Sequence, residues 1–242
     1  MRTLAIAAIK GGTGKTTTAA ALAQAAVKDG RKVLAVDLDP QANLSYVIGA
    51  DQNRRGAYHL LTGTPAGELL QDTAQGIAVI SGSPDLSTIQ TAPGSGRRLR
   101  EALEPVREEY DICIIDTPPT FGELIYNALY AADALLIPLE ADTNSLQGLY
   151  QITDIAGQIK KGNAGLQIAG TVITRYDGRA KFNRYLKDVI AEKGAASGAP
   201  LITVIRAGIS VREAAAMQES LFDYAPASKP AADYMELYRA IF

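Results

Sequence analysis

The chain contains 242 residues, of which 47% are hydrophobic and 21% are charged, and its formal net charge is −2. These values are typical of a soluble globular protein, and the length suits a single α/β domain with a substantial core, which we expect to span residues 1–242. One cysteine, Cys113, excludes a disulfide framework or a protein-held iron–sulfur cluster within one chain, and one histidine, His59, argues against a zinc site or a serine triad.

The apolar segments of the sequence indicate the cellular compartment of the protein. After one arginine, the N-terminal segment "TLAIAAI" is too short for a signal peptide and runs straight into glycines. No apolar run approaches the roughly 18–20 residues that a bilayer span requires. We therefore expect a cytoplasmic protein.

Short apolar segments alternate with helical patterns along the chain. Several of these segments are hydrophobic on both faces, as parallel strands covered by helices are. An alanine-rich helix is predicted to follow a glycine-rich loop and to stop at Gly30. Helical periodicity predicts another helix at 97–110, which Pro105 should kink or shorten, and further helices at 180–192 and at the C-terminal end. The predicted strands are residues 4–9, 32–37, 77–82, 111–116, 134–139, 166–174 and 201–205.

This alternation predicts an α/β fold with a doubly wound, mostly parallel sheet flanked by helices. We find no repeat, no low-complexity tract and no linker that would divide the chain. The segment "TAPGSGRR" at 91–98 is rich in small residues and is expected to form a mobile loop.

The segment "KGGTGKTT" at 10–17 follows the first strand and opens a helix, which is the context of a phosphate-binding loop. Glycines let backbone N–H groups converge on phosphate oxygens, and the helix dipole favours negative charge. Lys15 is expected to reach the β- and γ-phosphates, and the Thr16 hydroxyl to bind Mg²⁺. The predicted nucleotide-binding residues of this loop are Lys10, Gly11, Gly12, Thr13, Gly14, Lys15, Thr16 and Thr17.

Carboxylates stand at the ends of two further strands. Asp37 and Asp39 follow the second strand in "VDLDPQ", and Asp116 ends "DICIID". A single aspartate in such a place is usually a turn or helix-cap residue. Three of them at the carboxyl ends of neighbouring strands, beside a phosphate loop, indicate a magnesium-dependent nucleotide site.

The loop departs from the usual pattern at its start, where Ile9 replaces a glycine and Lys10 follows it. Together, "KGGTGKT", "DLDPQ" and "DICIIDTPP" closely resemble the motifs of the ParA/MinD family of deviant Walker-A ATPases. The segments "GAYHLLTG", "GSPDL", "TRYDGR" and "YAPASKPAADYMEL" look most like those of chromosomal-type ParA (Soj) proteins. The resemblance covers nearly the whole chain.

The resemblance implies an ATPase that uses ATP and Mg²⁺ and works as a switch. ATP binding would form a sandwich homodimer in which Lys10 reaches the phosphates held by the partner subunit, as an arginine finger does. Asp39 matches the residue that positions the attacking water, so Lys10, Lys15 and Asp39 are the expected catalytic residues. Thr16, Asp37 and Asp116 would serve the magnesium shell. Hydrolysis is expected to be weak and to be stimulated by a ParB-like or other adaptor protein.

The surface that the dimer binds is expected to be DNA. Residues 175–212 include eight basic and three acidic residues, an excess of +5. On the helix at 180–192, Lys181, Arg184 and Lys187 lie away from an apolar stripe and are expected to contact the DNA backbone without sequence preference. The C-terminal "ADYMELYRAIF" lacks the basic face of a membrane-binding helix, so no membrane partner is expected and the protein would associate with the nucleoid. The residues of the expected stripe are Phe182, Tyr185, Leu186, Val189 and Ile190.

The chain departs from the pattern of the family it resembles after the strand at 201–205. "RAGIS" at 206–210 replaces the family's "PRNVR", which lies near adenine and near the DNA-binding face. Arg206 and Gly208 are candidate nucleotide contacts, and Arg206 and Arg212 are further candidate DNA contacts. Two alternatives to DNA partition remain open at this point. One is an ATPase that positions a protein cargo, and the other is a P-loop biosynthetic ligase of the dethiobiotin-synthetase type.

Overall fold

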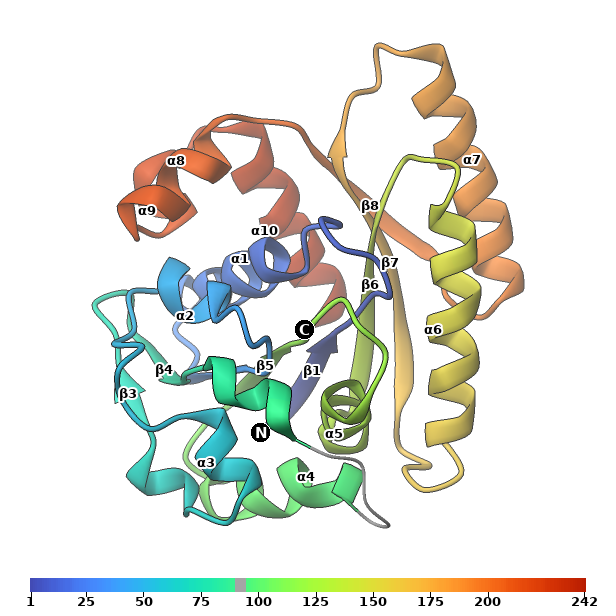
Figure 1. The fold of residues 1–242 in the computed structure, drawn as a ribbon. Coiled ribbons are helices and arrows are strands. Elements are labelled where there is room, and N and C mark those ends of the chain that lie inside the picture. The colour runs from blue at the N-terminus through green and yellow to red at the C-terminus, as the bar shows by residue number, and fades with distance from the viewer. Residues whose placement is uncertain (90–94) are drawn as a thin grey trace.

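A computed structural model of the chain describes residues 1–89 and 95–242, and its centre is an eight-stranded sheet (Figure 1). The strand order is β3-β4-β2-β5-β1-β6-β7-β8. All neighbouring strands are parallel except β3 and β4, which are antiparallel. The strands are β1 (Arg2–Ile6), β2 (Val33–Asp37), β3 (Gln71–Asp72), β4 (Ile77–Ile80), β5 (Ile112–Asp116), β6 (Ala134–Glu140), β7 (Gln167–Tyr176) and β8 (Leu201–Arg206).

Helices cover both faces of the sheet, as the apolar character of its strands requires. Residues of α1, α2, α8, α9 and α10 pack against one face, and residues of α3, α4, α5, α6 and α7 pack against the other. The α-helices are α1 (Lys15–Lys28), α2 (Asn43–Val47), α3 (Ala57–Leu61), α4 (Arg98–Leu103), α5 (Glu123–Ala131), α6 (Ser145–Ile159), α7 (Lys181–Ala196), α8 (Ser210–Met217), α9 (Leu221–Tyr224) and α10 (Lys229–Ile241).

The topology places the acidic strand ends next to the glycine-rich loop. In the central strands, Ile6 of β1 is in register with Asp116 of β5, which is in turn in register with Asp37 of β2. The chain fills the sheet on one side of β1 before it crosses to β6 on the other. Ligands of doubly wound proteins bind at such a reversal, outside the carboxyl ends of the strands.

The predicted fold class is confirmed, and all seven predicted strands are present. The first strand ends at Ile6 rather than at residue 9, because the chain turns there into the loop. The predicted helix at 97–110 is shortened as expected: α4 ends at Leu103, and a 3₁₀ turn at Glu104–Val106 follows with Pro105 in it. No pattern in the sequence predicted β3, which has only two residues.

The expected loop at 91–98 is only partly described. Residues 91–94 lie outside the described part of the chain. The expectation is wrong for the other four residues, because Ser95–Arg97 forms a 3₁₀ turn and Arg98 begins α4. Leu99 anchors this segment: its side chain is fully buried, and its backbone N–H donates to Asn127 Oδ1 at 3.0 Å.

The predicted apolar stripe of α7 is wrong in its first half. Phe182 and Tyr185 are 56% and 63% exposed, and the buried residues of the helix are Leu186, Ile190 and Gly194. The first turns of α7 rise beyond the strands of the sheet (Figure 1), so they have no sheet to pack against. Periodicity identified the helix but not how much of it the sheet supports.

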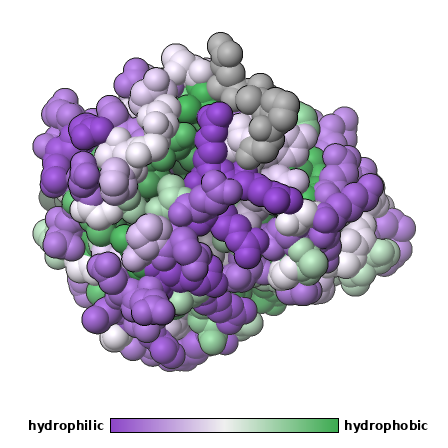
Figure 2. Space-filling view, turned by 90° about the horizontal axis from the view of Figure 1, so that it is seen from below, coloured by the Kyte–Doolittle hydropathy of each residue, from purple (hydrophilic) through white to green (hydrophobic). Residues whose placement is uncertain are grey.

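The apolar stripe of the C-terminal helix is part of the core, as predicted. Tyr234, Leu237 and Tyr238 of α10 are at most 4% exposed and belong to the cluster that includes α1. Among the described residues, no helix is both long and apolar enough to cross a bilayer. The surface seen from below the view of Figure 1 is mostly hydrophilic (Figure 2).

Candidate nucleotide-binding site

A cavity of about 850 Å³ opens at the carboxyl edge of the sheet. One end, which we call the loop end, is formed by the glycine-rich loop, the start of α1, and Asp39. The other, which we call the β8–α8 end, is formed by Ile205, Arg206, Ala207, Gly208, Ile209, Val211, Arg212 and Tyr234. The volume falls in the range of sites for small-molecule ligands and cofactors. The predicted site residues that line it are Gly11, Gly12, Gly14, Lys15, Thr16, Thr17, Asp39, Arg206, Gly208 and Arg212.

The backbone of the loop requires its glycines. Gly12 and Gly14 have φ angles of +79° and +84°, in the left-handed region that favours glycine. A Cβ atom on Gly14 would also lie 3.1 Å from Thr174 Cγ2, because β7 packs closely against the loop. Gly14 is the N-cap of α1 and offers no side-chain cap, so the first N–H groups of the helix remain available to an anion.

Lys15 supplies the positive charge of the loop end. Its side chain is largely buried, and Nζ donates to the backbone carbonyl of Lys10 at 3.1 Å. Burial lowers the pKa of Lys15, whereas the nearby Asp116 and Asp39 carboxylates act in the opposite direction. The ammonium group is therefore held in a partly desolvated place where an anionic ligand would stabilise its charge.

Thr16 and Asp116 form a pair of oxygen ligands suited to magnesium. Thr16 Oγ1 donates to Asp116 Oδ2 at 2.7 Å, and the Thr117 N–H donates to Oδ1 at 3.1 Å. Burial and the nearby Asp37 raise the pKa of Asp116 well above its usual range. Within the described residues, no group of three or more His, Cys, Asp or Glu side chains could hold a metal by itself. Mg²⁺ fits such a site because it commonly takes one or two carboxylates and completes its shell with phosphates and water.

Asp37 acts on the polypeptide that follows β2. Its Oδ2 accepts hydrogen bonds from Ser45 N–H at 2.9 Å and Ser45 Oγ at 2.7 Å, and its Oδ1 accepts from Asp39 N–H at 3.0 Å. Burial raises the pKa of this carboxyl to about 6. Asp39 lines the cavity, and its Oδ1 accepts from Gln41 N–H at 2.9 Å. Asp37 thus orients the turn that presents Asp39.

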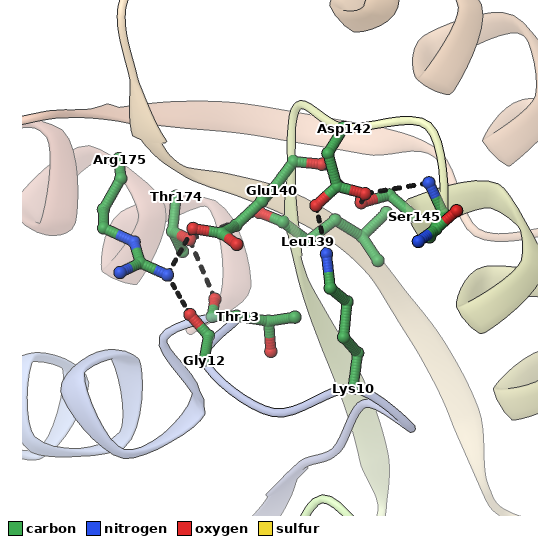
Figure 3. A network of polar contacts seen from close by, with 10 residues as sticks. Lys10, Gly12, Thr13, Leu139, Glu140, Asp142, Ser145, Thr174 and Arg175 are labelled. Atoms are coloured by element: carbon green, nitrogen blue, oxygen red, sulfur yellow. Dashed lines mark hydrogen bonds and ion pairs between the residues drawn. The ribbon is translucent and has the colours of Figure 1, made fainter.

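Lys10 lies at the entrance to the loop, and its Nζ contacts Asp142 Oδ2 in the turn between β6 and α6 (Figure 3). Burial acts to raise the pKa of Asp142, but hydrogen bonds from Lys10 Nζ, Asn144 N–H and Ser145 Oγ lower it below its usual value. Sequence reasoning missed Asp142, and no local signal could have found it, because the two residues are 132 positions apart.

At the β8–α8 end, Arg206 is held by Asp233 of α10. The Arg206 N–H donates to Asp233 Oδ2 at 2.8 Å, and its guanidinium donates from Nε to Oδ2 at 2.9 Å and from Nη2 to Oδ1 at 2.5 Å. Gly208 packs so closely on α10 that a Cβ atom there would lie 2.7 Å from Pro230 Cγ. Asp233 was not predicted from the sequence.

The candidate DNA-binding residues do not form one patch. Lys181, Arg184 and Lys187 lie on α7, whereas Arg206 and Arg212 lie at the cavity, and α7 and α8 are far apart in Figure 1. Arg184 Nη1 donates to the carbonyls of Gly178 at 2.7 Å and Arg179 at 3.0 Å. The basic residues of 175–212 that pair with an acidic side chain are Arg175, Arg179, Lys187, Lys193 and Arg206. Those with no ion pair among the described residues are Lys181, Arg184 and Arg212.

Comparison with known proteins identifies the family. Residues 1–168 match the family model described as an AAA domain. The chain is 36% identical over 241 residues to the chromosome-partitioning ATPase Soj of Thermus thermophilus, covering 98% of this chain and 94% of Soj. It is 41% identical over 188 residues to the chromosome partitioning protein ParA of Myxococcus xanthus, covering 74% and 66%. The chain therefore belongs to the ParA/MinD family of P-loop ATPases, as its motifs predicted.

Solved structures agree with this assignment. Apo McdA of Cyanothece superposes with a TM-score of 0.86 at 28% identity, covering 98% of both chains. The septum site-determining protein MinD of Pyrococcus horikoshii, complexed with Mg-ADP, gives 0.79 at 28% identity and covers 98% of this chain and 94% of MinD. A cobyrinic acid a,c-diamide synthase of Mycobacterium smegmatis, with bound ADP and magnesium, gives 0.84 at 28% identity with coverages of 99% and 93%.

Proposed function

We propose that the whole chain is one ParA-like ATPase domain that binds ATP and Mg²⁺ in the cavity and partitions or positions DNA. The observation that carries the proposal is the convergence of Lys15, the Thr16–Asp116 pair and Asp39 on the glycine-rich loop. The similarity to Soj, 36% identity in an alignment that covers 98% of this chain, supports the partition role.

The loop end and the carboxylates beside it have distinct roles in hydrolysis. The backbone N–H groups of the loop bind phosphate oxygens, and Lys15 neutralises charge on the β- and γ-phosphates. Thr16 and Asp116 would hold Mg²⁺, and the ion would offset further phosphate charge. The Asp39 carboxylate positions the water whose oxygen bonds to the γ-phosphorus while the bond from that phosphorus to ADP breaks. Asp37 keeps Asp39 in place through its backbone N–H.

Lys10 makes the reaction depend on dimerisation. In the single chain its ammonium group is paired with Asp142. In the dimer it leaves Asp142 and contacts the phosphates in the partner's site, which completes charge neutralisation only when two subunits meet. Hydrolysis by the isolated protein is accordingly weak, and an adaptor of the ParB kind accelerates it.

The ATP-bound dimer contacts the phosphate backbone of DNA and so associates with the nucleoid. Of the candidate contacts, Lys181, Arg184 and Arg212 keep a charge that no acidic side chain of the described residues neutralises. Lys181 is the best test position, because Arg184 also holds two carbonyls of the β7–α7 loop.

The test uses an ATP-locked dimer. Asp39→Ala should retain ATP, because the attacking water is no longer positioned, and should shift random duplex DNA in a gel with an affinity that falls steeply with salt. Adding Lys181→Glu should weaken that binding and leave ATP-dependent dimerisation intact. Arg54→Glu, an equal charge change at an exposed residue on another part of the surface, is the control. Binding that needs no ATP, or that Lys181→Glu and Arg54→Glu alter equally, would contradict this assignment.

A second candidate function is a P-loop biosynthetic ligase, which the similarity to the diamide synthase favours. ATP hydrolysis measured with and without DNA, and with and without the protein encoded by the neighbouring gene, distinguishes the partition ATPase from the ligase. Stimulation by DNA and that protein supports partition or positioning, including the positioning of a protein cargo. Turnover that is indifferent to both supports the ligase.

A further inference from the structure

The last residues of β7 pack against the phosphate loop, and two of them, Thr174 and Arg175, also line the cavity. Thr174 Oγ1 donates to the carbonyl oxygen of Thr13 at 2.8 Å, and Arg175 Nη2 donates to the carbonyl oxygen of Gly12. The same Arg175 nitrogen pairs with Glu140 Oε1 at the end of β6 (Figure 3). Two consecutive loop carbonyls are thus held by two consecutive side chains of a neighbouring strand.

The backbone at Arg175 is unusual for a residue with a side chain. Its φ angle is +51°, one of three positive values at non-glycine residues in the described part of the chain. The pairing of β7 with β8 shifts register between Ile173 and Tyr176, so the strand is irregular at this point. Such irregularities near ligand sites re-aim a side chain, and a left-handed arginine persists only where its surroundings compensate for the strain. Here the side chain is aimed at the loop and away from the strand ladder.

Holding a carbonyl also orients the N–H group that follows it. The peptide bond is planar, and no cis peptide occurs among the described residues, so the Gly12 C=O and the Thr13 N–H point in opposite directions. By the same geometry, holding the Thr13 carbonyl orients the Gly14 N–H. Carbonyls that are held towards Thr174 and Arg175 direct these two N–H groups the opposite way, which leaves them available to an anion.

We propose that Arg175 is a positioning residue that preorganises the phosphate loop: with Glu140 as its counter-ion, it fixes the Gly12 carbonyl and thereby aims the Thr13 N–H at the bound phosphate. The proposal rests on the phosphate-site assignment above. Thr174 does the same for the Gly14 N–H from its place in the core. Arg175 differs from Lys15 in kind, since it acts on the backbone of the loop and leaves the phosphate to the N–H groups.

The test compares Arg175→Met with Arg179→Met. Methionine keeps an unbranched stem and removes every donor, and Arg179 is an exposed arginine of the same segment that pairs with Asp177 away from the loop. Calorimetry with Mg-ADP should show about tenfold weaker binding for Arg175→Met and unchanged binding for Arg179→Met. Arg175→Lys, which keeps a cationic donor, should recover part of the loss. Binding of Mg-ADP to Arg175→Met within twofold of the wild type would overturn the proposal.

A second measurement separates positioning from direct contact with phosphate. In the nucleotide-free protein, the amide NMR signals of Thr13 and Gly14 should shift and broaden in Arg175→Met, because the loop samples several orientations. If affinity falls while these signals stay as in the wild type, Arg175 acts on the ligand itself and the positioning role is refuted. Failure of the site assignment would look different, since Lys15→Ala would then bind Mg-ADP like the wild type.

Discussion

The two ends of the cavity are built in different ways. The loop end consists of a contiguous segment whose backbone N–H groups face the ligand. The strand-end carboxylates Asp37 and Asp116 lie beside it. The β8–α8 end depends on an ion pair between Arg206 and Asp233, which belong to different elements, and on close packing at Gly208. Charge and backbone geometry dominate at the first end, and tertiary pairing dominates at the second. Variants at the first should therefore affect every phosphorylated ligand, and variants at the second only ligands that carry a base.

Lys15→Ala should have the largest effect on ligand binding. The loop loses its own cation on the β- and γ-phosphates, so affinity for ATP and for inorganic pyrophosphate should fall together by about a hundredfold or more, equivalent to roughly 3 kcal/mol. Calorimetry with both ligands measures this. Unchanged ATP affinity would refute the phosphate-loop assignment. A loss of affinity confined to ATP would show that the loop end does not bind phosphates independently of the base.

Lys10→Ala should leave ATP binding by the monomer largely intact and prevent the nucleotide-dependent dimer. Asp142→Asn should promote the dimer, because it weakens the contact that holds Lys10 while its Oδ1 still accepts from Asn144 N–H and Ser145 Oγ. The pair is about one-third exposed, so the gain in dimer affinity should be modest, about two- to fivefold. Light scattering with ATP and Mg²⁺ measures dimerisation of the Lys10→Ala and Asp142→Asn variants, each made in the Asp39→Ala background. Normal dimerisation of the Lys10 variant would refute its role across the interface.

The difference between the two ends also separates what the sequence predicted from what it could not. The local spacing of residues 10–17 predicts the phosphate loop. Asp37 and Asp116 are predicted beside it because parallel strands end at the same edge of a sheet. The partners of Lys10 and Arg206, Asp142 and Asp233, lie in distant segments of the sequence. The local pattern around Lys10 or Arg206 therefore does not predict these partners. The exposure of Phe182 was missed for a related reason: periodicity describes a helix but not the extent of the sheet beneath it.

Asp116→Asn should stabilise the nucleotide-free protein at pH 7. Burial raises the pKa of Asp116 well above its usual range and that of Asp37 to about 6, so the folded chain binds protons that the unfolded chain has released above about pH 4. Their contribution to stability is therefore largest at low pH and is lost as the pH rises through the folded pKa values. An amide needs no proton to stay neutral when it is buried, so the substitution should raise the free energy of unfolding by about 1–3 kcal/mol at pH 7.

Urea unfolding in EDTA at pH 5 and pH 7 measures this effect. The wild type should gain stability towards pH 5 from these groups, and Asp116→Asn should show a smaller difference between the two pH values. In the variant, Mg-ADP should bind more weakly, because a neutral amide replaces a carboxylate of the magnesium site. A variant that is less stable than the wild type at pH 7 would show that the hydrogen bonds of Asp116 outweigh the cost of its burial.

Asp233→Asn tests the β8–α8 end. The substitution removes the charge that holds the Arg206 guanidinium, so the wall of the cavity loses its fixed shape. Affinity for ATP should fall about tenfold, equivalent to roughly 1.4 kcal/mol, and affinity for pyrophosphate should not change. Calorimetry with the same two ligands as for Lys15→Ala gives the comparison directly. Equal losses for both ligands would show that the two ends of the cavity are coupled and act as one site.

The smallest expected effect concerns two threonines with opposite roles, Thr13 in the loop and Thr174 on β7. Thr13 and Thr174 are 1% and 3% exposed, but Thr13 Oγ1 has no hydrogen-bond partner among the described residues, whereas Thr174 Oγ1 donates to the Thr13 carbonyl. Thr13→Val removes an unsatisfied hydroxyl and should raise the free energy of unfolding by about 1 kcal/mol, and Thr174→Val should lower it by about 1–2 kcal/mol. The chemical change is the same in both variants.

Ligand binding gives the sharper half of this comparison. If the loop end works through its backbone, Thr13→Val should bind Mg-ADP as the wild type does, since only the N–H of Thr13 faces the phosphate. Thr174→Val frees the Thr13 carbonyl, so the Gly14 N–H loses its fixed direction and Mg-ADP should bind several-fold more weakly. Urea unfolding and calorimetry on the two variants give both quantities. A loss of affinity in Thr13→Val would mean that its side chain, and not the backbone alone, takes part in binding at the loop end.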